Sequence, residues 1–215
     1  MIRVWLILWL LVPLAVVAWH VGPGQRQLSE DRAGVYIRQA QAAADEQRWE
    51  DSARAYGQAR MLLPDEARGE TYRLELEAAL AWIRSGDDRR GQQMLEDLLA
   101  TMQQDAEVDE DLYVAASQEL AVASYHAAWL LRLTEAPVDQ WRAKARLAVQ
   151  QFRSLAERAE GRAASATNRR NSTAHRQARI FKRNLEAAVK LQQLDLEQLR
   201  ARPVPDYLPK LTKPN

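Results

Sequence analysis

The sequence predicts an all-α protein, and two observations carry that prediction. Ala, Leu, Arg, Gln and Glu dominate the 215 residues, whereas there are only 8 Gly and 8 Pro. The abundant residues favour helices, and the chain has few of the β-branched runs that are typical of strands. In several segments apolar residues recur every three or four positions, as on one face of a helix. We expect a single N-terminal transmembrane helix, about three helical hairpins, and a long C-terminal helix that caps them.

The first segment, residues 1–24, is predicted to anchor the chain in a membrane. No charged residue occurs in residues 4–21, and eighteen helical residues span roughly 27 Å, close to the hydrocarbon thickness of a bilayer. Trp5 and Trp19 lie near the two ends of this run, where interfacial tryptophans are common. A cleaved signal peptide ending near Ala18 is the alternative. The positive charge before the run predicts a cytoplasmic N-terminus, an inner-membrane span and a periplasmic helical domain.

The first hairpin is predicted from residues 47–64, QRWEDSARAYGQARMLLP, which read as one helix followed by proline. The small residues Ser52 and Ala59 flank Tyr56, so another helix can approach closely there. The stretch just before it supplies a partner helix of the same kind. Residues 33–66 together resemble the 34-residue tetratricopeptide repeat (TPR).

Two poorer copies follow. Residues 71–102 have a turn at Gly86 and the small residue Gly91 in the second helix. Residues 111–133 and 136–158 form a third pair of related shape but greater length. Because one such hairpin cannot bury its apolar face alone, the resemblance implies a TPR-like α-solenoid over residues 25–160. An ordinary bundle of six helices is the alternative.

The C-terminal part, residues 161–202, combines a basic segment with an amphipathic helix that is predicted to begin near Ala178. We expect this helix to cap the solenoid, with docking on a partner as the alternative. Residues 203–215 are rich in proline and predict an extended tail, either packed on the domain through Tyr207 and Leu208 or open to a partner. The basic residues are a candidate contact for anionic headgroups or an acidic protein, or else the solvated side of a helix. They are Arg169, Arg170, Arg176, Arg179, Lys182 and Arg183.

No motif for catalysis, cofactor binding or metal binding is found in the sequence. Because there is no Cys, disulfides, thiolate metal sites and cysteine nucleophiles are excluded. The three histidines lack metal-site spacing, and phosphate-binding and serine-hydrolase motifs are missing. The acidic residues 105–111 lack the pattern of a calcium-binding loop and predict a solvated connection. We expect no enzyme activity, no cofactor, no metal, no small-molecule substrate and no nucleic acid.

The TPR resemblance also implies a groove, because the first helices of successive TPR hairpins line a concave face. Leu80 and Ile83 would seat apolar side chains of a partner, and Arg73 and Arg84 would bind its carboxylates. The alternative is that the apolar positions pack against the neighbouring hairpin. The complete set is Ile37, Gln41, Ala44, Asp45, Arg73, Leu76, Leu80, Ile83 and Arg84.

The function implied by the resemblance is a membrane-anchored, periplasm-facing scaffold that binds a protein and assists assembly or maturation of a membrane or periplasmic complex. The anchor, length and helical content are also similar to MxaK-type proteins, which are encoded beside MoxR-type ATPases and von Willebrand factor A proteins. The alternative is a structural accessory subunit of a membrane complex, held through its transmembrane helix. In that case Trp5 and Trp9 contact other transmembrane helices. If the protein is instead a scaffold, residues 4–21 contact the lipid bilayer, with Trp5, Trp9 and Trp19 as anchors.

Overall fold

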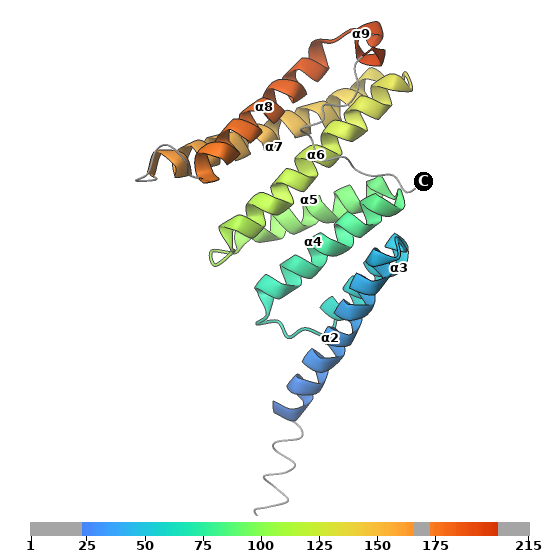
Figure 1. Ribbon diagram of the computed structural model, residues 1–215, viewed down its shortest axis with the longest axis vertical. Helices are drawn as coiled ribbons and strands as arrows, with labels where there is room; N and C mark the ends of the chain where they lie inside the picture. Colours follow the sequence, from blue (N-terminus) through green and yellow to red (C-terminus); the bar gives the residue numbers. More distant parts are fainter. Residues whose placement is uncertain (1–22, 166–172, 202–215) are drawn as a thin grey trace, which may run out of the picture.

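The computed structural model describes residues 23–165 and 173–201, and these ranges are helical throughout apart from short connections (Figure 1). No strand occurs in them, so the predicted all-α class is confirmed. The helices are α2 (Pro23–Asp45), α3 (Trp49–Arg60), α4 (Arg68–Ser85), α5 (Asp88–Gln104), α6 (Glu110–Leu133), α7 (Val138–Ser165), α8 (Thr173–Gln193) and α9 (Leu196–Arg200).

Each long helix packs chiefly against the helices before and after it in the chain. Short connections between packed helices make such neighbours antiparallel. The result is a row with α2 at one end and α8 at the other (Figure 1). In addition, α4 contacts α6. The first and second hairpins after α3 therefore also touch through the helices that begin them, α4 and α6.

Capping residues mark where the helices begin and end. Gly86 ends α4 in a left-handed conformation with φ of 96°, which glycine adopts without steric cost. The side chain of Asp87 then accepts a hydrogen bond from the backbone N–H of Arg90 at 3.2 Å, and Asp109 accepts one from the N–H of Asp111 at 2.9 Å. These carboxylates satisfy donors at the N-termini of α5 and α6.

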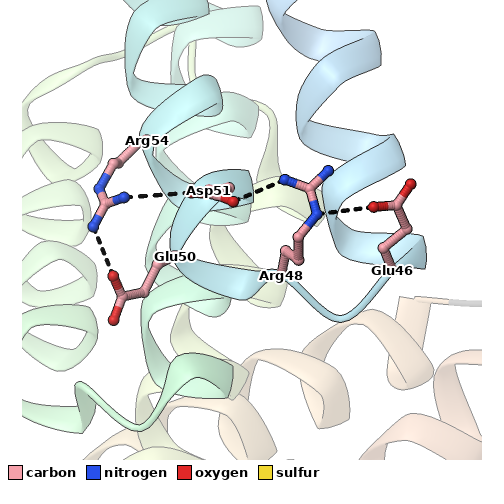
Figure 2. Close-up of polar contacts among 5 residues, drawn as sticks. All are labelled: Glu46, Arg48, Glu50, Asp51 and Arg54. Atoms are coloured by element: carbon pink, nitrogen blue, oxygen red, sulfur yellow. Dashed lines mark hydrogen bonds and ion pairs between the residues drawn. The ribbon is translucent and has the colours of Figure 1, made fainter.

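Ion pairs surround the turn between α2 and α3 (Figure 2). Arg48 lies 2.8 Å from both Glu46 and Asp51. Arg54 pairs with Glu50 at 2.6 Å and with Asp51 at 3.3 Å. Each exposed ion pair contributes little to the stability of the fold on its own, but Asp51 pairs with both arginines. The negative charges of Glu50 and Asp51 also interact favourably with the positive N-terminal end of α3.

The core is a series of interfaces between successive helices. The largest cluster joins α6, α7 and α8 and includes Phe152, Phe181 and Leu191, and a second joins α4, α5 and α6. Helices α4 and α5 approach so closely at Gly91 that an added Cβ would lie 2.7 Å from the carbonyl oxygen of Ala79. Small residues therefore set the spacing between helices.

The end of α8 is held by a side chain of α6. Arg132 donates hydrogen bonds to the carbonyl oxygens of Leu191 and Leu194, and its guanidinium carbon lies 4.5 Å from the centre of the Trp141 ring on α7. The last carbonyls of a helix have no partner within the helix. Arg132 supplies partners for two of them and connects α6, α7 and α8.

The ends of three helices bear on the segments that were predicted from the sequence. Pro23 and Gly24, the last residues of the predicted segment 1–24, are the first residues of α2, and proline is well suited to the first helical turn. Helix α7 continues past the change of composition at Gly161 to Ser165. The long C-terminal helix stops at Gln193, and Asp195 caps the separate helix α9.

Residues 1–22 of the predicted anchor, which include Trp5, Trp9 and Trp19, lie outside the described residues, and so does the predicted tail 203–215. In residues 23–165 and 173–201, no helix is long and apolar enough to cross a bilayer.

Candidate partner-binding surface

Helix α4 has one stripe that neighbouring helices leave open. Arg73 and Glu77 are exposed, and Leu80 and Arg84 are half-buried. Their spacing of four, three and four residues places them on one face of a helix. The rest of α4 is largely covered, because one side packs on α2 and α3 and another on α5 and α6.

Charges from α2 and α6 extend this stripe. Burial raises the pKa of the Tyr56 hydroxyl, the negative charges of Glu77 and Asp45 raise it further, and the positive charge of Arg84 lowers it. These three charged groups therefore lie close enough to Tyr56 for their charges to act on its hydroxyl. Glu119 on α6 is half-buried, and its pKa is raised by burial and by Glu77 but lowered by Arg84.

Arg84 lies in the last turn of α4, at the end of the stripe. Its guanidinium carbon is 5.1 Å from the centre of the Trp49 ring, a position in which a cation is attracted to the ring face. Its charge also reaches Tyr56 and Glu119 on the two flanking helices. We call the whole surface the α2–α4–α6 face. It comprises Gln41, Asp45, Arg73, Glu77, Leu80, Arg84 and Glu119.

Most of the residues predicted for a groove lie on or beside this face. Gln41 and Asp45 are exposed on α2, and helical spacing places them near Ile37, which is half-buried against the core. Ala44 is half-buried. Asp45 of α2 and Glu77 of α4 both act on Tyr56, so the ends of these two predicted sets lie near one another. That they form a groove for a partner stays a prediction.

Leu76 and Ile83 are exceptions and require a correction. Their side chains are only 7% and 4% exposed and belong to the core between α4, α5 and α6. They contribute to helix packing and offer no surface to a partner. The reason is that α4 packs on two sides, so its apolar residues occupy two buried stripes and the open stripe is mostly polar.

Sequence reasoning missed Glu77 and Glu119. A signal for Glu77 was present, because it lies four residues after Arg73 and three before Leu80, on the same helical stripe. Glu119 had no comparable signal, because only the packing of α6 against α4 brings it within range of Arg84.

The charged segments of the sequence have different surroundings. The acidic segment is largely paired: Glu110 lies 2.9 Å from Arg158, Asp111 lies 3.0 Å from Arg162, and Asp105 accepts a hydrogen bond from the Tyr72 hydroxyl at 2.9 Å.

Of the predicted basic patch, four residues are exposed on α8 and two, Arg169 and Arg170, lie outside the described residues. The four are Arg176, Arg179, Lys182 and Arg183.

Chemically, the α2–α4–α6 face offers carboxylates, the apolar edge of Leu80 and two guanidinium groups. Arg84 is stacked on the Trp49 ring, and Arg73 lies 3.8 Å from Asp109. Such a mixture can hydrogen-bond and pair with the charged and polar groups of a polypeptide. Among the described residues, no group of three His, Asp or Glu side chains lies in a position to hold a metal ion. Comparison of the chain with protein-family models, curated proteins and solved structures finds no match.

Proposed function

We propose that this protein is a TPR-like helical scaffold that binds another protein through the α2–α4–α6 face. The observation that carries the proposal is the open stripe of α4, Arg73–Glu77–Leu80–Arg84, on a helix that is otherwise covered by its neighbours. A row of hairpins offers an extended surface, which suits a partner that makes contacts along several helices.

The cellular setting is part of the same proposal. The apolar residues 4–21 anchor the chain in an inner membrane, with the helical domain in the periplasm, where it assists assembly or maturation of a membrane or periplasmic complex. The support for this setting is the sequence of residues 1–24. The alternative is an accessory subunit that is held in a complex through its transmembrane helix, with Trp5 and Trp9 as contacts.

Co-purification of the full chain from membranes tests the proposal. We compare the wild-type protein with Glu77→Arg on the α2–α4–α6 face and with Glu157→Arg, an equal change of charge at an exposed position of α7. Mass spectrometry identifies and quantifies the protein that co-purifies. We expect Glu77→Arg to reduce its recovery by at least about tenfold, because a reversed charge at an interface costs more than 1 kcal/mol, and Glu157→Arg to leave recovery unchanged.

A second pair of chains distinguishes the alternative. In one, an unrelated single-pass segment replaces residues 1–22, and in the other, Trp5 and Trp9 are changed to Leu. The scaffold retains its partner in both. Loss of the partner from these chains, together with normal recovery by Glu77→Arg, would overturn the scaffold and favour the accessory subunit.

A further inference from the structure

The outer side of α8 is a strongly basic surface at the end of the row. Residues 173–193 carry five Lys or Arg side chains and one acid, Glu186. All five basic side chains are exposed, and four of them recur at spacings of three, four and seven residues, as on one face of a helix. We call this surface the basic face of α8. It comprises Arg176, Arg179, Lys182, Arg183 and Lys190.

No described helix packs on this side of α8, whose opposite side is buried against α7. A solenoid covers its terminal helix with polar groups, so charge alone would fit a solvated end. Two exposed aliphatic side chains do not fit it. Ile180 is 44% exposed and Val189 is 37% exposed, and Ile180 lies one helical turn from Arg176 and from Arg183. Cations with aliphatic side chains beside them are typical of helices that lie on a bilayer surface.

The charge of the basic face is not neutralised within the described part of the chain. In residues 23–165 and 173–201, no ion pair involves Arg176, Arg179 or Lys182. By contrast, the two arginines near the end of α7 pair with Glu110 and Asp111 at 2.9 and 3.0 Å. Like charges three or four residues apart on a helix repel one another, and an anionic surface relieves that repulsion.

The start of α8 lies at the edge of the row that adjoins the predicted membrane span. Successive helices alternate in direction, so α2, α4, α6 and α8 all begin at one edge (Figure 1), and residues 4–21 lie just before α2. The acidic connection between α5 and α6 lies at the same edge and is partly neutralised. Arg68 and Arg73 lie 3.6 and 3.8 Å from Asp105 and Asp109. The charge that remains for an anionic bilayer is therefore that of α8.

We propose that the basic face of α8 binds the surface of a bilayer that contains anionic phospholipids. Arg176, Arg179 and Lys182 pair with the phosphate groups, and Ile180 enters the interface beside them. Each such basic residue strengthens binding to an anionic surface by about fivefold. The choice of a bilayer over an acidic protein rests on the membrane setting proposed above. The row is then held at both ends, α2 by the span and α8 by its charge.

Lipid contact at α8 is measured in the full chain, reconstituted into vesicles of phosphatidylcholine alone or mixed with phosphatidylglycerol. Because the protein has no cysteine, Ile180→Cys accepts a single fluorescent NBD label, and lipids with a doxyl group on the acyl chain quench a label that enters the bilayer. Leu130→Cys is the labelled control. Leu130 is also aliphatic and is 37% exposed, but it lies in the last turn of α6, at the opposite edge of the row.

Charge reversal in the labelled Ile180→Cys chain tests the role of the basic residues. Three bases of the basic face are changed in one variant, and three exposed bases of α7 are changed in a control of equal net charge. Circular dichroism verifies that both variants are folded. The first set is Arg176→Glu, Arg179→Glu and Lys182→Glu, and the second is Arg142→Glu, Arg146→Glu and Arg153→Glu.

We expect quenching at position 180 to be at least about tenfold greater in the anionic vesicles than in the neutral ones, because several basic residues act together. It should be lost in the α8 variant, persist in the α7 variant and be absent at position 130. Equal quenching in both kinds of vesicle, or quenching that survives the α8 changes, would overturn the proposal. A shift in the emission of the label with polyglutamate, but no quenching in anionic vesicles, would also overturn it and assign the face to an acidic protein.

Flotation of the chain with phosphatidylcholine vesicles tests the span of residues 4–21 separately. A chain that floats without quenching at position 180 in anionic vesicles retains the span and lacks the α8 contact, which overturns the present proposal alone. Quenching in anionic vesicles by a chain that does not float with neutral ones would support the α8 contact and overturn the span.

Discussion

Arg84 is the residue around which the candidate surface is organised. It stacks over Trp49 of α3, lowers the pKa of Tyr56 on the same helix, and lowers that of Glu119 on α6. Trp49 and Glu119 belong to different hairpins, on either side of the α4–α5 hairpin that carries Arg84. A single side chain thus interacts with an aromatic ring, a tyrosine hydroxyl and a carboxylate that belong to the two hairpins flanking its own.

Glu119 gives a pH-dependent prediction at the same scale. Burial raises its pKa in the folded protein above the unfolded value of about 4.3. Its contribution to the free energy of unfolding is therefore greatest below that pH and is lost as pH rises through the folded pKa. We expect Glu119→Gln to raise the melting temperature at pH 7, with the difference disappearing near pH 4. An increase that is independent of pH would contradict this explanation.

Substitution by Ala is expected to have opposite effects on stability at two glycines, Gly91 and Gly57. In Gly91→Ala the new methyl group clashes with Ile83 and Ala79. Overpacking of this kind reduces the free energy of unfolding by about 1–3 kcal/mol, which exceeds the stabilisation that the higher helix propensity of Ala provides. In Gly57→Ala the methyl group enters open space, and the helix gains up to about 1 kcal/mol. Urea unfolding measures both, and equal effects on the two variants would contradict the close approach of α4 and α5.

At the scale of elements, the position of α8 depends on contacts that cross between helices. Its buried residues include Phe181, Asn184 and Leu191, and its last carbonyls receive hydrogen bonds from Arg132. Burial lowers the pKa of Arg132 from its usual value, although the group remains charged at any physiological pH. The end of the row is therefore fixed by an arginine and not by apolar packing alone.

Arg132→Met tests this arrangement. We expect it to reduce the free energy of unfolding by about 2 kcal/mol, the usual contribution of hydrogen bonds from a charged donor. Hydrogen exchange should accelerate in α8 and α9 but not in α2 and α3. Arg142→Met is the control, because the guanidinium carbon of Arg142 also lies over the Trp141 ring, at 5.4 Å from its centre, and Arg142 is exposed. An equal loss in both variants would show that contact with the ring, and not the carbonyls, matters.

Helices and turns could be predicted from the sequence because their signals are local. The turn at Gly86 and the small residues Ser52 and Ala59 were identified from spacing, and the latter two are fully buried. Which side of a helix faces solvent was harder to predict. Leu76 and Ile83 have the same period as Leu80, so the pattern alone could not show that α5 and α6 cover the first two and leave the third partly open.

At the scale of the whole molecule, the row separates two surfaces. The α2–α4–α6 face involves the first three hairpins, whereas the exposed basic residues of α8 belong to the helix at the opposite end of the row from α2 (Figure 1). Since each helix contacts mainly its neighbours, a change in one surface has small effects on the stability of the others. Variants of each surface can therefore be interpreted separately.

The most direct test of the central claim is photo-crosslinking of the full chain in its native membrane. A benzophenone amino acid replaces Gln41 or Glu77 on the α2–α4–α6 face, Gln150 on α7 as an exposed control, or Trp9 in the N-terminal segment. We predict that Gln41 and Glu77 crosslink to one and the same protein, and that Gln150 does not. Crosslinks to a partner from Trp9 alone, with none from Gln41 or Glu77, would contradict the account.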